Sequence, residues 1–181
     1  MSALSQFVSG HLPEKYRPCA GVFLLNRRGQ VFAGHRNDVD TDDVIASLID
    51  KPWQLPQGGI DPGETPAQAV MREMLEEIGT DNATILAQSR QWYCYDLPKE
   101  IADMKWSGKY RGQAQKWFAL RFDGADSEIN IATRHPEFDA WKWVDIEDVC
   151  DLVVAFKRDV YARVVDEFRP YATALQHMAR A

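Results

Sequence analysis

Residues 53–80 read WQLPQGGIDPGETPAQAVMREMLEEIGT and contain a helix that is marked at both ends. Thr65 is a suitable N-cap, Pro66 suits the first helical position, and Gln68 completes a Thr-x-x-Gln capping box. Gly79 follows the last apolar residue and is a natural C-terminal stop. The sequence therefore predicts a helix between these two caps, preceded by a glycine-rich turn.

Two neighbouring arcs of this helix carry different chemistry. At 100° per residue, one arc is apolar and is expected to face the core; it comprises Ala67, Val70, Met71, Met74, Leu75 and Ile78. The adjacent arc carries Glu73, Glu76 and Glu77. Glu73 is three and four residues from the other two, so their Cβ atoms are expected about 5–6 Å apart.

Three carboxylates on one face repel each other, by about 0.2–0.5 kcal/mol for each like-charged pair. Glu76 and Glu77 also lie in the last turn, where the helix dipole disfavours negative charge. A hard divalent cation such as Mg²⁺, which takes oxygen ligands, would make this arrangement favourable. The alternative is a solvated acidic helix face without a metal.

Composition excludes several classes of protein. The chain has 181 residues, which favours a single domain, and 27 acids against 21 bases give a net charge of −6. A large non-specific DNA-binding surface is not expected from such a chain. Three scattered cysteines disfavour a disulfide framework or a thiolate zinc site and fit a reducing cytosol. No apolar run is long enough to span a membrane, and residues 1–10 lack the features of a signal peptide.

Strands and helices alternate along the chain, which predicts an α/β or α+β fold. Residues 1–15 are expected to form a flexible leader, and residues 37–52 an acidic, loop-like insertion in a single domain over 16–181. A C-terminal amphipathic helix is predicted from the stripe Val153, Phe156, Val160, Val164 and Phe168. The predicted strands lie in 20–25 and 30–33 (a hairpin around 26–29), 53–55, 85–95, 114–122 and 140–144.

The helix and its preceding turn resemble the Nudix box of the Nudix hydrolase superfamily. The matching positions follow the pattern G-x5-E-x7-R-E-M-x-E-E-x-G and are Gly58, Glu64, Arg72, Glu73, Glu76, Glu77 and Gly79. Met74 and Thr80 occupy two slots that are aliphatic in the family; Thr80 is the larger departure, and it concerns packing at the helix exit.

Further blocks, from about Tyr16 to Arg169, resemble the subfamily of RNA pyrophosphohydrolases and dinucleoside polyphosphate hydrolases. Compact members of this subfamily lack the acidic insertion, which acts as a lid, narrows the substrate range, or is a surface loop without a role. The matching blocks are Tyr16-Arg17-Pro18, Ala20-Gly21-Val22, residues 53–60, Gln115-Lys116-Trp117-Phe118, Pro136-Glu137-Phe138-Asp139 and residues 156–161.

The resemblance implies a Nudix fold, an α/β/α sandwich, and Mg²⁺-dependent attack of water on a polyphosphate chain, with Mn²⁺ as the substitute ion. It implies Glu73, Glu76, Glu77, Glu137 and the carbonyl of Gly58 as metal ligands. Glu64 is expected to pair with Arg72 and to order the box, or to form only a loop ion pair. The general base stays open between Glu73, Glu77 and metal-bound hydroxide.

The resemblance also implies a substrate site. Arg17 and Arg36 match family positions at the 5′ end of the substrate, and Lys116 is a further phosphate-binding candidate. Val154, Phe156 and Lys157 match the segment that forms the nucleobase pocket in relatives. For Phe156, a core position on the helix stripe is the competing interpretation.

The leading functional hypothesis is a cytoplasmic, bacterial RNA pyrophosphohydrolase that converts a 5′-triphosphate or diphosphate RNA end to a monophosphate and so promotes mRNA decay. The alternative within the family is asymmetric hydrolysis of diadenosine tetra- or pentaphosphate to release ATP. A non-catalytic nucleotide-binding regulator is the alternative of another class, and the repulsive glutamates argue against it. The sequence leaves open whether a protein activator binds.

Overall fold

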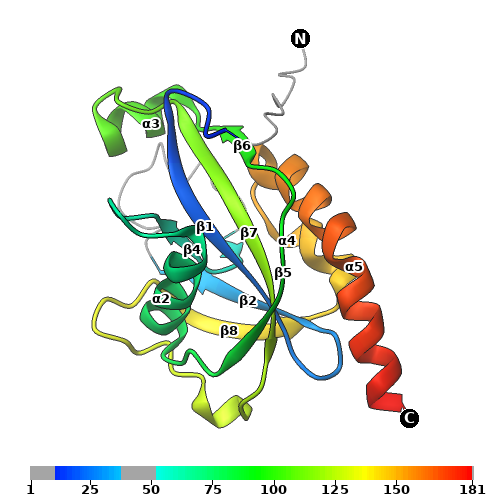
Figure 1. Ribbon diagram of the computed structural model, residues 1–181. Helices are drawn as coiled ribbons and strands as arrows, with labels where there is room; N and C mark the ends of the chain where they lie inside the picture. The colour runs from blue at the N-terminus through cyan, green and yellow to red at the C-terminus, as the bar shows by residue number, and fades with distance from the viewer. Residues whose placement is uncertain (1–10, 38–51, 181) are drawn as a thin grey trace.

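In the computed structural model of this protein, described for residues 11–37 and 52–180, one mixed sheet lies between helices (Figure 1). The sheet order is β3-β2-β1-β7-β5, while β4 pairs with β1, β6 with β7 and β8 with β2. Residues 1–10 of the predicted leader and 38–51 of the predicted acidic insertion lie outside the described residues. The strands are β1 (Tyr16–Leu25), β2 (Val31–Arg36), β3 (Trp53–Gln54), β4 (Gln57–Gly59), β5 (Ala83–Gln88), β6 (Tyr93–Asp96), β7 (Gly112–Phe122) and β8 (Phe138–Val144).

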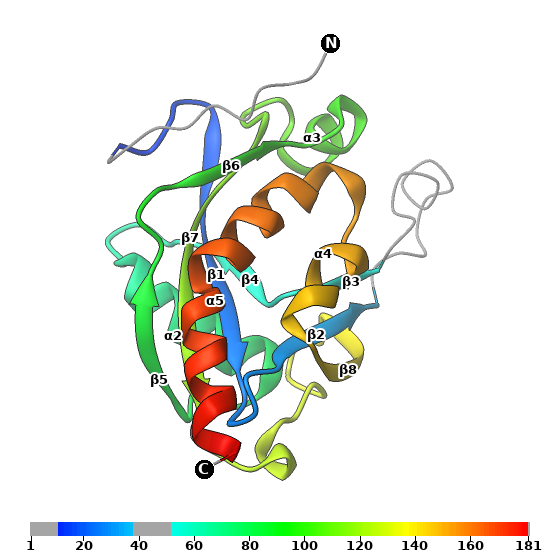
Figure 2. The ribbon, with the colours of Figure 1, turned by 90° about the vertical axis from the view of Figure 1, so that its right-hand side faces the viewer.

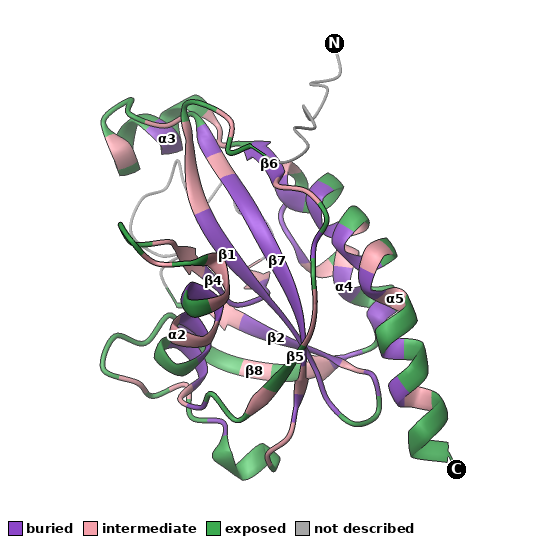
Figure 3. Cartoon of the chain, in the orientation of Figure 1, coloured by how far each residue is buried: buried purple, intermediate pink, exposed green. Residues whose placement is uncertain are grey.

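The centre of the sheet is the parallel pair of β1 and β7, which share a continuous register from Tyr16–Gly112 to Leu25–Arg121. Buried residues run along both strands (Figure 3), as expected for strands covered on both faces. The predicted hairpin after β1 is confirmed, since Gly29 donates to the carbonyl of Asn26 and has a φ of 72°.

Helices cover both faces of the sheet, and the sheet separates two clusters of buried apolar residues. On one face, α2 (Pro66–Ile78) packs against a cluster that includes Val22, Leu24 and Phe118. On the other, α4 (Val149–Leu152) and α5 (Arg158–Arg180) pack against a cluster that includes Phe23 and Trp117 (Figure 2). The expected α/β/α sandwich is therefore present. Within residues 11–37 and 52–180, none of the helices combines the length and the apolar character that a membrane span requires.

The predicted caps of α2 are confirmed. The Thr65 hydroxyl accepts from the Gln68 amide at 3.2 Å, the Gln68 side chain accepts from the Thr65 amide at 2.9 Å, and Gly79 is left-handed with a φ of 75°. The predicted core face is only partly right. Ala67 and Met71 are half-buried and Leu75 is 48% exposed, whereas Ala69, Glu73 and Glu77 are buried with Val70, Met74 and Ile78. The helix is turned so that its acidic arc, rather than Leu75, faces β4.

Three other expectations are corrected. The predicted strand 85–95 is two strands, β5 and β6, which pair with different parts of β7. The C-terminal helix begins at Arg158, so Val153 and Phe156 of the predicted stripe precede it, with Phe156 in the short helix η3 (Ala155–Lys157). A helix that the sequence pattern did not indicate, α3 (Lys99–Trp106), joins β6 to β7. It has no side-chain cap at its N-terminus.

The orientation of α2 can be tested with two neighbouring residues. Met74→Ala is expected to lower the free energy of unfolding by about 2–5 kcal/mol, because Met74 is fully buried. Leu75→Ala should lower it by about 1 kcal/mol or less, because Leu75 is already 48% exposed. Urea titration of both variants measures this difference. Equal losses would show that α2 presents the face predicted from periodicity.

Candidate active site

The acidic arc of α2 approaches β4 at Gly58, where the chain has no room for a side chain. Gly58 pairs with Ala20 of β1. A Cβ at Gly58 would lie 2.0 Å from the Glu73 carboxyl carbon. Glu73 is 7% exposed, and burial raises the pKa of its carboxyl group, against the opposing ion pair with Arg72. Only glycine allows a buried carboxylate to pack directly against this strand.

Glu77 lies one helical turn further and is 2% exposed. Its two carboxyl oxygens are each 3.3 Å from the backbone amide of Gln57, which donates to them. Burial raises the pKa of Glu77 well above its ordinary value, and the neighbouring charges of Glu137 and Glu73 raise it further. Ionised Glu77 therefore requires a compensating positive charge.

Glu137 reaches this cluster from a different part of the chain. It precedes β8, and its backbone carbonyl accepts a hydrogen bond from the amide of Asn37 at 3.1 Å. Its charge raises the pKa of both Glu73 and Glu77. The structure thus brings together three of the predicted metal ligands from two segments.

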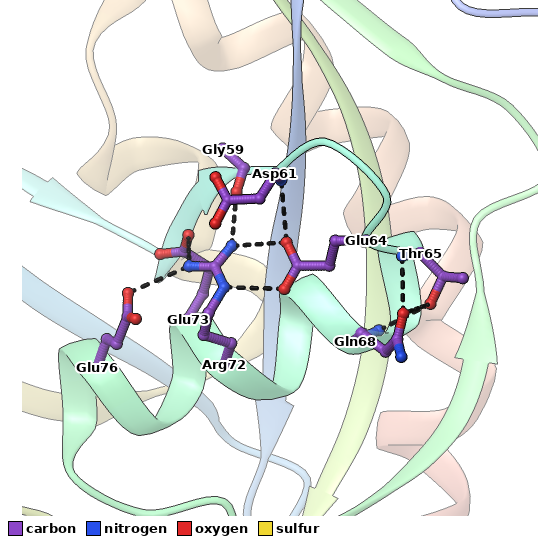
Figure 4. Close-up of polar contacts among 8 residues, drawn as sticks. All are labelled: Gly59, Asp61, Glu64, Thr65, Gln68, Arg72, Glu73 and Glu76. Atoms are coloured by element: carbon purple, nitrogen blue, oxygen red, sulfur yellow. Dashed lines mark hydrogen bonds and ion pairs between the residues drawn. The ribbon is translucent and has the colours of Figure 1, made fainter.

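Arg72 links the helix to the glycine-rich turn (Figure 4). Its guanidinium group donates two hydrogen bonds of 2.8 Å to the Glu64 carboxylate and one of 2.8 Å to the carbonyl of Gly59. It also contacts Glu73 at 2.7 Å and Glu76 at 3.2 Å. The predicted Glu64–Arg72 pair is present. Because Arg72 also binds the carbonyl of Gly59, its contacts hold α2 to the end of β4 as well as to the loop that contains Glu64.

The same contacts keep Glu64 ionised. The hydrogen bonds from Arg72, together with the backbone amide of Asp61 at 3.0 Å, lower the pKa of Glu64 to about 2. Glu64 therefore stays negatively charged at neutral pH. Its carboxylate accepts hydrogen bonds from Arg72 and from the backbone amide of Asp61 in the turn.

The chemistry of these donors fits a hard divalent cation. They are carboxylate oxygens and a peptide carbonyl. Arg72 pairs with Glu73, while burial and the charges of Glu137 and Glu73 disfavour the ionised form of Glu77. Within residues 11–37 and 52–180, no three histidine, cysteine, aspartate or glutamate side chains are already arranged as a complete metal site. Arg72 holds Glu73 and Glu76, so binding a cation would require these side chains to change partner.

The carboxylates open into a cleft of about 650 Å³ that also contains positive charge. Arg17 lies beside Gly59, where a Cβ would come within 2.3 Å of its Nη2 atom. An anionic chain in the cleft would thus meet cations as well as the acidic cluster. The predicted site residues that line the cleft are Arg17, Arg36, Gly58, Glu73, Glu76, Glu137, Phe156 and Lys157.

Phe156 and Lys157 form one wall of the cleft with Tyr95. The Phe156 ring is 5.9 Å from that of Tyr95, centroid to centroid, and is also packed against the core. Lys157 donates to Gln54 at 3.0 Å and lies 5.7 Å from the centre of the Tyr95 ring. Phe156 thus fits both the core position and the pocket position that the sequence left open, because it packs against the core and also lines the cleft.

Two predicted substrate-binding residues are not brought to the cleft. The ammonium group of Lys116 donates to the carbonyl of Arg90 at 3.3 Å and lies 5.8 Å from the Trp92 ring centre. Val154 is buried, and its carbonyl accepts from the amide of Lys157. Neither residue is among those that line the cleft, and neither is carried into the proposal below.

A row of glutamines behind the carboxylates was not anticipated. The Gln57 side chain accepts from Gln115 at 2.8 Å and donates to Gln113 at 3.1 Å, and Tyr95 donates to Gln113 at 2.7 Å. These bonds hold the strand whose amide binds Glu77. The alternating Gln113 and Gln115 at the start of β7 were the available signal, because polar residues two apart share one face of a strand.

The NUDIX domain model matches residues 15–164. An RNA pyrophosphohydrolase of Rhodospirillum rubrum is 50% identical over 159 residues, which cover 87% of this chain and 89% of that protein. One of Roseobacter denitrificans is 48% identical over 158 residues, covering 86% and 93%. The solved binary complex of a C. elegans Ap4A hydrolase has a TM-score of 0.59 at 19% identity, covering 88% of this chain and 97% of that one; this likeness concerns the fold alone.

The cost of burying the Glu77 carboxylate can be measured as a change in the free energy of unfolding. In metal-free buffer, Glu77→Gln is expected to raise the free energy of unfolding at pH 7 by on the order of 1 kcal/mol or more, because it removes a buried charge. The pKa of Glu77 is raised in the folded state, so the wild type loses stability as the pH rises above the ordinary glutamate value. The gain should therefore shrink towards pH 4.

Urea titrations in the presence of a chelator, at several pH values, measure this gain. Glu147→Gln is the matched control, since its exposed ion pair with Arg169 contributes little. A loss of stability in Glu77→Gln at pH 7 would contradict the assignment of Glu77 as a strained carboxylate.

Proposed function

This chain belongs to the NUDIX family, and we propose that it hydrolyses the pyrophosphate linkage at the 5′ end of triphosphorylated or diphosphorylated RNA, leaving a 5′-monophosphate. The membership confirms the resemblance predicted from the helix and its turn. Relatives named RNA pyrophosphohydrolase that match most of the chain at 44–50% identity support RNA as the substrate.

The observation that carries the proposal is a carboxylate cluster with two buried members, Glu73 and Glu77, beside a cleft with basic residues. The charge of Glu137 raises the pKa of Glu73 and of Glu77, while Arg17 and Arg36 line the same cleft. A polyphosphate needs both features, because cations bind its oxygens and the carboxylates hold the metal that offsets its charge.

Mg²⁺ is the proposed cofactor, with Mn²⁺ as its substitute. Glu73, Glu76, Glu77 and Glu137, with the carbonyl of Gly58, would hold it. When bound, a divalent cation supplies the positive charge that lets carboxylates and phosphates share the cleft, and it acidifies water. Arg72 and Glu64 position the turn and the helix relative to each other.

The chain's own groups account for orientation and proton transfer. Arg17 and Arg36 bind the phosphate chain, and Phe156 with Lys157 holds the first nucleobase. Glu73 lines the cleft, whereas Glu77 lies behind it. Glu73 is therefore better placed to accept a proton from the attacking water, and Glu77 to anchor the metal. The product is an RNA with a 5′-monophosphate, and its formation in the cytoplasm would promote mRNA decay.

Replacement of Glu73 or Glu77, the two buried carboxylates, should strongly lower turnover. In Mg²⁺, Glu77→Gln and Glu73→Gln are expected to lower kcat on a 5′-triphosphorylated RNA by about a hundredfold or more, because each removes a ligand or a proton acceptor. Glu147→Gln, on the exposed surface, should retain wild-type turnover. Release of inorganic phosphate or pyrophosphate measures these rates, and a chelator should stop the reaction. Near-normal activity of both variants would remove the proposed mechanism.

The substrate is tested by direct comparison. We expect kcat/KM in Mg²⁺ to be higher for a 5′-triphosphorylated RNA than for diadenosine tetraphosphate. A much higher value for the dinucleotide would assign the chain to hydrolysis of dinucleoside polyphosphates instead.

A further inference from the structure

The sheet has two long strands, β5 and β8, that pair on one side only, and they differ in charge. Within residues 11–37 and 52–180, β5 pairs with β7 alone and β8 with β2 alone. An unpaired edge presents backbone N–H and C=O groups to which another strand can bind, and charged side chains or prolines usually prevent this. β8 carries the exposed Asp139 and Lys142. β5 reads ATILAQ and contains neither a charge nor a proline.

The β5 edge is open and partly apolar. Each of its six residues is half-buried or exposed (Figure 3), and Ile85 is 38% exposed. Figure 2 shows the strand at the border of the sheet, on the side away from β8. The ladders of β5 with β7 and of β8 with β2 each contain one register shift, so a bulge does not distinguish the two edges. The lack of charge is therefore the feature that leaves β5 able to accept another strand.

The two ends of β5 are flanked by opposite charges. Asp81 precedes the strand and is exposed. Arg90 follows it, and its side chain is 90% exposed, with Nε 3.7 Å from the Glu167 carboxylate of α5. In an antiparallel pair of identical strands, the start of each strand lies beside the end of the other. Asp81 of each copy would therefore lie near Arg90 of the other, at both ends of the pair.

This charge pattern favours a second copy of the chain as the occupant. The net charge of −6 opposes the approach of two copies at most surfaces. At β5 the strand itself is uncharged and its flanking charges are self-complementary, so the repulsion is offset there. A two-fold contact also uses the same edge of both copies and leaves neither β5 edge unpaired, which makes the assembly a closed dimer.

We propose that two copies of this chain associate through β5, antiparallel about a two-fold axis, so that the two sheets continue into one another. None of the residues of β5 lines the cleft. The contact therefore leaves the cleft of each copy accessible. The inference goes beyond the proposed function and does not depend on it.

The β5 contact is tested by sedimentation equilibrium of the unaltered protein over a wide range of concentrations, which is expected to show monomers and dimers in equilibrium. Ile85→Lys places a charge on the edge of both copies and should raise the dissociation constant of the dimer about tenfold or more. Ala140→Lys is the matched control, because it introduces the same side chain at an exposed position of β8. It should leave the dissociation constant unchanged.

The flanking charges give a second test that leaves the strand intact. Arg90→Glu should raise the dissociation constant about tenfold, because two acidic groups then lie near each other at both ends of the pair. Adding Asp81→Lys to this variant should restore the dimer, because opposite charges again lie together. The restoration reports a contact between copies, since within one copy the two positions lie at opposite ends of β5.

A protein that stays monomeric at every concentration would overturn the inference. A dimer that Ile85→Lys and Arg90→Glu leave intact, or that Ala140→Lys weakens equally, would also overturn it by assigning the contact to another surface. Sedimentation does not depend on turnover, so the dimer and the proposed function can each fail without the other.

Discussion

The site depends on the burial of a carboxylate among other carboxylates. Glu77 is enclosed between α2 and β4, where its contact with the Gln57 amide only partly offsets the loss of solvent and the charges of Glu73 and Glu137. The rest of the fold tolerates this cost because the apolar part of α2 is well packed against the sheet. A group that destabilises the fold in the absence of a cation is well suited to bind one.

Three segments meet at this cluster, and the sheet determines how they meet. The parallel pairing of β1 with β7 brings Gln113 and Gln115 beneath β4, while β8 pairs with β2 and places Glu137 opposite α2. Arg72 then ties the helix to the carbonyl of Gly59. The acidic cluster is thus held by backbone pairing and one guanidinium group, which leaves the glutamate side chains as the adjustable part.

Where expectation and structure differ, long-range packing prevailed over local pattern. Periodicity placed Leu75 in the core, but α2 packs Glu73 against Gly58 and leaves Leu75 48% exposed. Lys116 matched a family block, yet its strand directs it to the carbonyl of Arg90. Helix α3 has no side-chain cap and is short, so little in its own residues distinguished it from a loop.

The sequence alone determined the helix with both its caps, the acidic arc, the hairpin and the family, because each depends on residues close together in the chain or on a spaced pattern within it. The tertiary structure decided which face of α2 is buried, that Lys116 and Val154 do not line the cleft with Glu73, and that α3 forms its far wall. These are relations between segments distant in sequence. They follow from strand register and from the volume available at Gly58, which no local pattern encodes.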